Sequence, residues 1–202
     1  MSRFGDDPRA FFDGVYQGAA PWDIGAAQPA LVELFGEHPP GGPVLDVGCG
    51  SGDLAIHLAG AGLEVLGVDF VESAVAEARE RAAAAGAASA EFRVGDALRP
   101  SLLGRRFASV VDCGFLHLFD SAQCERFAEE VASVLLPGGR YYVLAFAVEF
   151  PIANAPRRVT EEELRSWFSP ARGWSFLEAR PARFESRVAV VPALAACIHR
   201  MG

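Results

Sequence analysis

Three glycines at alternate positions follow a short apolar run in the first third of the chain. The run, residues 43–47, reads PVLDV, and Gly48, Gly50 and Gly52 separate it from the helix-like stretch DLAIHLAGAG. A continuous apolar run of this length is typical of a strand that is covered on both faces. Glycines between such a strand and a helix allow unusual torsions and let a ligand approach the main chain closely. The pattern therefore predicts a parallel α/β sheet with a ligand-binding turn.

The spacing of this turn distinguishes between two kinds of ligand. A dinucleotide-binding turn has the spacing GxGxxG, whereas this chain has GxGxG. Asp46, at the end of the strand-like run, would repel a pyrophosphate but can accept a hydrogen bond from a cationic amine. These features disfavour NAD and FAD and favour a ligand that carries an amine. The alternative is a turn that serves folding alone, for which Asp46 and three glycines are costly.

The rest of the chain extends the same pattern and then changes it. Strand-like runs at 43–47, 64–68, 90–94, 107–112 and 140–146 alternate with helix-like stretches that include 71–85 and 122–135. This alternation predicts five β/α units. A capping box then predicts a helix over 160–168, and two more runs, 174–183 and 188–200, predict a terminal hairpin. Pro192 restricts the core of the last strand to 193–199.

Two further acids follow predicted strands. Asp69 ends the second one, where an α/β fold presents a carboxylate to ribose hydroxyls. Asp96 closes the third within GDAL and can bond an exocyclic amine, while Ala97 offers an apolar floor for a base. The alternative for Asp96 is a structural aspartate in a turn or at a helix start.

Composition excludes several other functions. The chain has 202 residues, which is most simply one domain, and its net charge of −8 has the wrong sign for a binder of nucleic acid. Its four cysteines form no CxxC pair, so we expect neither disulfides nor a metal site. It has neither a signal peptide nor an apolar stretch of ~18 residues, so we expect a cytoplasmic protein without a membrane partner.

The motifs together resemble the class I S-adenosylmethionine-dependent methyltransferases. The resemblance covers residues 43–148 through VLDVGCGSG, the acid of GVDF, the GDAL step and the LLPGGRYYV turn. It implies a single Rossmann-like α/β domain with a mostly parallel seven-stranded sheet and a C-terminal antiparallel hairpin. In this reading, residues 1–40 form an N-terminal lid, 43–148 bind the cofactor and 149–202 add a helix and the hairpin. The implied cofactor is S-adenosylmethionine, with S-adenosylhomocysteine as its product.

The resemblance also assigns cofactor-binding residues. The stretch PWDIGAAQPALVEL is similar to the entry motif of thiopurine, thiol and halide methyltransferases and of benzoquinone or heterocycle methyltransferases. That likeness implies that Trp22 and Gln28 lie against the cofactor, although Trp22 is otherwise a core aromatic residue. The remaining residues expected to bind the cofactor are Asp46, Gly48, Cys49, Gly50, Asp69, Phe70, Asp96, Ala97 and Cys113.

The acceptor side carries fewer signals. His117 lies in the segment after the fourth strand and is the one candidate base there, with plain packing as the alternative. Six aromatic residues are candidates for an apolar acceptor pocket, although each is also a candidate for the core: Phe11, Phe12, Tyr16, Phe115, Phe119 and Phe150.

The sequence thus predicts in-line methyl transfer to sulfur or oxygen of a small, apolar or aromatic acceptor. N-methylation of a heterocycle and a noncatalytic cofactor-binding subunit are the alternatives. We expect a monomer or a weak homodimer.

Overall fold

Seven strands form one sheet in the order β3-β2-β1-β4-β5-β7-β6 in the computed structural model, which describes residues 4, 7–18, 20–152 and 154–202. Strands β1 to β5 are parallel, and β7 runs antiparallel to both β5 and β6. The mostly parallel sheet with a C-terminal antiparallel hairpin is therefore confirmed. The strands are β1 Val44–Val47, β2 Val65–Asp69, β3 Ala90–Val94, β4 Phe107–Cys113, β5 Leu135–Phe146, β6 Trp174–Glu185 and β7 Val190–Arg200.

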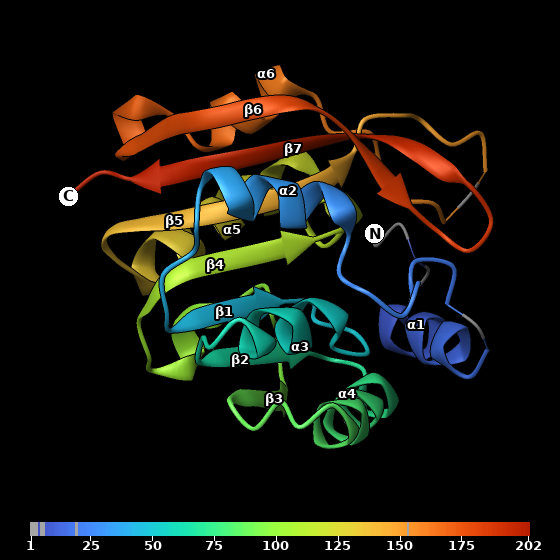
Figure 1. Cartoon of the computed structure of the whole chain (residues 1–202). Coiled ribbons are helices and arrows are strands. Elements are labelled where there is room, and N and C mark those ends of the chain that lie inside the picture. Colours follow the sequence, from blue (N-terminus) through green and yellow to red (C-terminus); the bar gives the residue numbers. More distant parts are fainter. Residues whose placement is uncertain (1–3, 5–6, 19, 153) are drawn as a thin grey trace.

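Helices cover both faces of this sheet (Figure 1). Side chains of α2, α3 and α4 form one buried cluster, and those of α5 and α6 form another. Every residue of β1 and β2 is buried, as the continuous apolar runs predict. The helices are α1 Pro8–Tyr16, α2 Pro29–Glu37, α3 Asp53–Gly60, α4 Glu72–Ala84, α5 Ser121–Val134 and α6 Glu161–Trp167; the short 3-10 helices are η1 Pro100–Leu103, η2 Leu116–Leu118 and η3 Pro170–Arg172.

The starts of two helices follow from capping residues. Thr160 and Glu163 form a reciprocal capping box at α6, as the sequence predicts, and Asp120 and Gln123 form another at α5. Each box satisfies backbone donors that would otherwise lack a partner at a helix start. These caps fix where the chain enters each helix on this face of the sheet.

The described residues among the first 40 fall into two parts with different surroundings. In α2, Leu31 and Leu34 are fully buried, and Phe35 contacts Tyr142 of β5 edge-on at 5.2 Å. Helix α2 therefore belongs to the layer of helices, with α3 and α4, that covers one face of the sheet. Helix α1 instead lies beyond the edge toward which the arrows of β1 and β4 point (Figure 1). A candidate lid therefore consists of α1 and the segment that follows it, without α2.

The last strand extends past Pro192, but only the part after the proline pairs with β5 as well as β6. Strand β7 contains Pro192, which pairs with Arg183 of β6. The ladder between β5 and β7 ends at Ala193, and beyond it Ala147 donates its N–H to the Pro192 carbonyl. The predicted core at 193–199 is therefore confirmed, and Val190–Pro192 extend β7 by pairing with β6.

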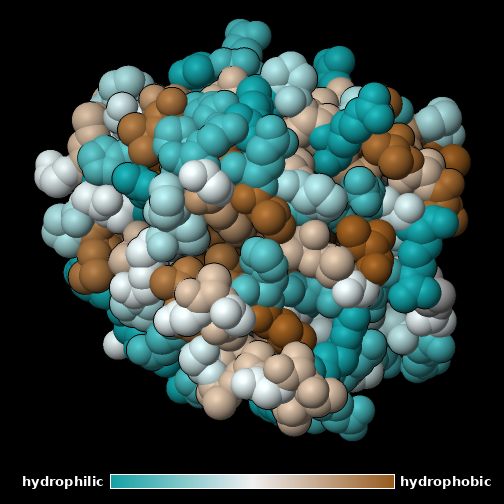
Figure 2. Space-filling view, viewed as in Figure 1, coloured by the Kyte–Doolittle hydropathy of each residue, from teal (hydrophilic) through white to brown (hydrophobic). Residues whose placement is uncertain are grey.

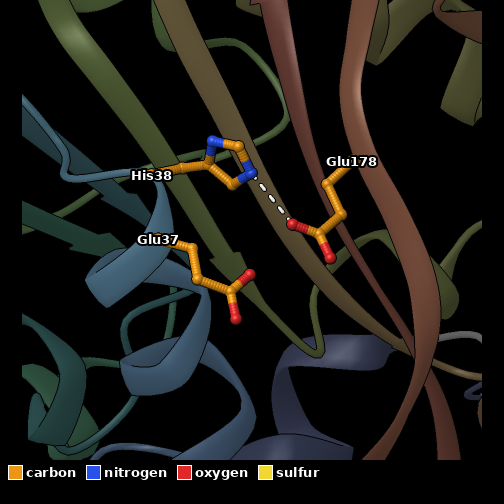
Figure 3. Close-up of side chains that lie close together, drawn as sticks. All are labelled: Glu37, His38 and Glu178. Carbon is orange, nitrogen blue, oxygen red and sulfur yellow. Dashed lines mark hydrogen bonds and ion pairs between the residues drawn. The ribbon is translucent and has the colours of Figure 1, made fainter.

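A group of charged side chains connects α2 to the far edge of the sheet (Figure 3). His38, which follows α2, places Nε2 2.9 Å from a carboxylate oxygen of Glu178 on β6. Arg180 donates to Glu178 at 2.7 Å and also to Glu37. The side-chain atoms of Glu37, His38 and Glu178 that could bind a metal ion lie within 4.8 Å of one another. Because the Arg180 guanidinium already pairs with both carboxylates, we describe the group as a salt-bridge network.

Candidate active site

The glycine-rich turn follows β1 and has the backbone that the sequence predicts. Gly48, Gly50 and Gly52 all have positive φ, at 65°, 51° and 88°. A Cβ on Gly48 would lie 2.5 Å from the Phe115 ring, and one on Gly50 would lie 2.5 Å from the Tyr16 hydroxyl. Both the torsions and the close neighbours therefore require glycine at these positions.

Asp46 stands at the end of the cavity beside this turn, with 1% of its surface exposed. Its Oδ2 has no hydrogen-bond partner among the described residues. Burial, followed by the nearby charges of Asp112 and Asp69, raises the pKa of Asp46 well above its usual value. An unpaired buried carboxylate oxygen is costly to the fold. It is therefore a candidate acceptor for a cationic ligand.

Asp69 holds the glycine-rich turn against the end of β2. One oxygen accepts the Gly50 N–H at 3.0 Å, and the other accepts the Val71 N–H at 2.9 Å. Burial raises the pKa of Asp69, and these backbone bonds oppose that shift. Each carboxylate oxygen keeps a lone pair that can accept a further hydrogen bond.

A cavity extends from the turn to two groups of aromatic rings. It and its mouth hold about 1130 Å³ of space free of atoms. The first group comes from the N-terminal segment and the end of β2, with ring centroids 4.9 to 6.1 Å apart; its members are Phe4, Phe11, Phe12, Trp22 and Phe70. The second group comes from η2, β5 and β6, and its members are His117, Phe146 and Phe184.

The predicted aromatic residues fall into two sets. Phe11, Phe12, Tyr16 and Phe115 line the cavity, as do the predicted cofactor residues Phe70, Cys49 and Cys113. Phe119 and Phe150 do not line it. They pack against Phe115 at 4.7 Å and Phe146 at 5.2 Å, respectively. Phe146 and Phe184 were missed, because nothing in their apolar strands distinguishes a cavity residue from a core residue.

Tyr16 lies beside the glycine-rich turn. Its hydroxyl faces Gly50 and accepts a hydrogen bond of 3.2 Å from the Trp22 indole. Burial, and after it the charge of Asp69, raises the pKa of Tyr16, so the phenol stays neutral. Gln28 also lines the cavity, but its amide exchanges two bonds of 2.8 Å with the backbone of Glu185.

Asp23 links the PWDIG stretch to the glycine-rich turn, and the sequence analysis missed it. Its carboxylate accepts from the Ser51 hydroxyl at 2.9 Å, from Arg81 at 3.2 Å and from the Gly25 N–H at 3.1 Å. These contacts fix the segment that carries Trp22. The only available signal was the position of Asp23 within PWDIG.

Asp96 and Ala97 do not line the cavity. Asp96 accepts the Leu98 N–H at 3.0 Å and pairs with Arg99 at 2.9 Å on the surface, as an aspartate in a turn does. Ala97 is 3% exposed and packs in the core. Their contact with a cofactor stays a prediction.

The two predicted cysteines are inert thiols in this setting. Burial is the main cause that raises the pKa of both Cys49 and Cys113 well above the usual value. Both therefore remain protonated at neutral pH. They contribute to the wall of the cavity rather than to its chemistry.

His117 lies in η2 with only 3% of its surface exposed. Its Nδ1 accepts the N–H of Phe146 at 3.0 Å. Burial lowers the pKa of His117 to about 3, so the imidazole is neutral at neutral pH. A neutral ring whose Nδ1 accepts a hydrogen bond carries its proton on Nε2.

The strand order, the glycine-rich turn after β1 and the acids that end β1 and β2 define the class I methyltransferase fold. The family description "Methyltransferase domain" matches residues 44–139. The 2-heptyl-1-hydroxyquinolin-4(1H)-one methyltransferase of Mycobacteroides abscessus is 31% identical over 182 residues, which cover 85% of this chain and 79% of the relative. The chain belongs to the class I S-adenosylmethionine-dependent methyltransferases, and S-adenosylmethionine is its methyl donor.

Solved structures agree with this assignment. One solved structure is described as "Conversion of a Disulfide Bond into a Thioacetal Group during Echinomycin Biosynthesis", and its chain is 31% identical to this one. The two superpose with a TM-score of 0.84, and the match covers 96% of this chain and 93% of that chain. The 1,6-didemethyltoxoflavin-N1-methyltransferase of Burkholderia thailandensis is 22% identical, with a TM-score of 0.73 and coverage of 96% and 88%. At that lower identity the likeness shows the fold alone.

Proposed function

We propose that this protein methylates an oxygen or sulfur atom of a small, flat, apolar acceptor. The observation that carries the proposal is the continuity of one cavity from the glycine-rich turn to the two groups of aromatic rings. Rings on two sides suit a flat apolar molecule. The quinolone-directed relative supports the same class of acceptor.

The residues around the turn fit S-adenosylmethionine. The unpaired oxygen of Asp46 suits an ammonium group, and the free lone pairs of Asp69 suit ribose hydroxyls. Gly48 and Gly50 leave the backbone open to close approach. When bound, the cofactor supplies an electrophilic methyl group on a sulfonium. Aromatic rings attract such a cation and exclude water from it.

The noncatalytic alternative lacks support from the surface. The aromatic groups face an internal cavity, and on the face seen in Figure 2 hydrophobic residues form separate groups between hydrophilic ones. A subunit that supports a partner would instead present a large apolar patch.

Among the described residues, no helix has the length and apolarity to cross a membrane. The net charge of −8 also disfavours a nucleic-acid acceptor.

Two measurements on the purified chain test the proposal. Calorimetry should show binding of S-adenosylhomocysteine and no binding of NAD. The chain should then release S-adenosylhomocysteine in a screen of thiols, phenols, hydroxyquinolones, halides and N-heterocycles. Turnover of oxygen or sulfur acceptors is the expected result. Turnover confined to N-heterocycles would move the reacting atom to nitrogen, and cofactor binding without any turnover would favour the noncatalytic subunit.

A further inference from the structure

The end of β4 and the short helix η2 build one wall of the cavity. The His117 ring stacks on Phe146 at 4.3 Å with an interplanar angle of 21°. Gly114, whose φ is +80°, leaves room beside the ring, because a Cβ there would lie 3.4 Å from His117 Nε2. The wall therefore places one polar atom, Nε2 of His117, among apolar rings.

The hydrogen-bonding role of that atom is fixed by the backbone. Phe146 donates its N–H to Nδ1, so the neutral ring holds its proton on Nε2. Nε2 has no hydrogen-bond partner among the described residues, and His117 lines the cavity. The free position of the ring is thus a donor, whereas a general base needs a free lone pair at the same place.

The other ionisable groups that line the cavity, Cys113 at the end of β4 apart, lie near the glycine-rich turn. Tyr16 already accepts from Trp22 and faces Gly50, and burial keeps the Cys113 thiol protonated. The carboxylates among the described lining residues follow β1 and β2 or flank the glycine-rich turn; they are Asp23, Asp46, Asp53 and Asp69. The wall around His117 therefore offers a donor and no base among the residues described.

We propose that His117 is the acceptor-recognition residue and donates Nε2–H to a flat aromatic acceptor that is already ionised at its reacting oxygen or sulfur. This inference rests on the proposed function and deepens it. The acceptor's anionic atom forms a bond to the methyl carbon, the bond from that carbon to the sulfonium sulfur breaks, and its electron pair stays on sulfur. No proton moves in this step. Acceptors with acidic hydroxyl or thiol groups are thus the favoured class.

Nitrogen NMR of 15N-histidine-labelled protein tests the tautomer without any turnover. The chain has four histidines, and loss of one signal set in His117→Gln assigns His117. We expect an unprotonated Nδ1 and a protonated Nε2 that do not titrate between about pH 6 and 8. A proton on Nδ1, or an imidazolium in that range, would overturn the proposal even if the protein is a methyltransferase.

Two variants separate donor from base. His117→Gln keeps an N–H near the position of Nε2 but cannot take up a proton, and His117→Phe keeps a ring against Phe146 without a donor. Both are assayed with 2-heptyl-1-hydroxyquinolin-4(1H)-one as acceptor, and the exposed His57→Gln is the control. We expect the phenylalanine variant to lose about 10- to 100-fold in kcat/KM, because it lacks a bond to a charged group. The His117→Gln variant should retain most of the wild-type kcat/KM. An equal loss of kcat/KM in the two variants would favour His117 as a general base.

4-Nitrophenol provides a third readout, because its anion is coloured and its ionisation is visible without turnover. A neutral donor should lower the pH at which the bound phenol ionises, in wild type and His117→Gln but not in His117→Phe. An unchanged ionisation in all three proteins would contradict the donor role. S-adenosylhomocysteine affinity should be the same in all three, so a failure to bind it concerns the proposed function and not His117.

Discussion

The part of the cavity at the glycine-rich turn, the proposed cofactor half, and the part around His117, the proposed acceptor half, are built in different ways. In the cofactor half, the glycine-rich turn, Asp46 and Asp69 come from one stretch of 26 residues, 44–69, and Asp69 accepts a hydrogen bond directly from Gly50 of the turn. In the acceptor half, Phe12, His117 and Phe184 come from segments that span most of the chain. The turn and these two acids are a local structure, to which Tyr16 and Asp23 add contacts from the N-terminal segment. The acceptor half exists only where the sheet and α1 bring distant residues together.

The two halves also differ in what holds their polar groups. Asp46 keeps a buried oxygen that has no hydrogen-bond partner in the described part of the chain, whereas His117 has one ring nitrogen bonded to the backbone and stacks on Phe146. The cofactor half is thus poised for a charged ligand, at a cost to stability. In the acceptor half, the bond from the Phe146 N–H and the stacking on Phe146 fix the orientation of the His117 ring before any ligand binds. Substitutions in each half should therefore have different signatures.

The largest effect is expected at the turn itself. In Gly50→Val the side chain would meet the Tyr16 hydroxyl and force a positive φ on a β-branched residue. We expect loss of S-adenosylhomocysteine binding by more than about 100-fold, measured by calorimetry, with strain of about 1–2 kcal/mol in the fold. Gly60→Ala in α3 is the control, because a Cβ there has no neighbour within 4 Å. Equal affinities in the two variants would show that the cofactor does not approach this turn.

The next effect concerns two buried acids of adjacent strands. Burial raises the pKa of Asp46 above its value in the unfolded chain, so the group destabilises the fold increasingly as pH rises from the unfolded value to the raised one, and the penalty is absent below the unfolded value. Asp46→Asn should therefore increase the free energy of unfolding at about pH 8, and the gain should shrink toward about pH 4. The same variant should weaken S-adenosylhomocysteine binding about 10-fold or more, since it removes a charged acceptor.

Asp112 on β4 provides the contrast. Its carboxylate accepts from the N–H groups of Phe115 and Leu116 and from the Tyr141 hydroxyl at 2.8 Å. Asp112→Ala leaves these buried donors unpaired and should lower the free energy of unfolding by about 2–3 kcal/mol. Urea denaturation measures both variants. Destabilisation by Asp46→Asn at high pH would mean that the Asp46 carboxylate is structural.

The smallest effect is expected in α1, which covers the cavity. Its Phe12 contacts Trp22 and Phe70, so a ligand that fills the cavity should hold the helix more firmly. S-adenosylhomocysteine should slow tryptic cleavage at Arg9 several-fold and leave cleavage at Arg165 of α6 unchanged. Equal protection at both sites would indicate global stabilisation, and no protection at either would remove α1 from the role of a lid.

Much of the fold could be predicted from local patterns. Strand β3 matches its predicted range, the capping box at Thr160 starts α6, and the hairpin follows the core. Helix α2 was not predicted, because Pro29–Glu37 lies within a stretch broken by prolines and glycines. Packing of Leu31 and Leu34 on the sheet stabilises this helix. Tertiary contacts thus decided an element for which the local signal is weak.

The sequence by itself determined the glycine-rich turn and its two acids, since strand burial, positive φ at three glycines and the acids near the ends of β1 and β2 are properties of short segments. Only the tertiary structure decided the acceptor half. It brought Phe146 and Phe184 to the cavity, left Asp96 outside it, and fixed the tautomer of His117 through a backbone N–H that lies 29 residues away. Hydrogen bonds and ring contacts between distant segments depend on how the strands are placed side by side, which no local pattern records.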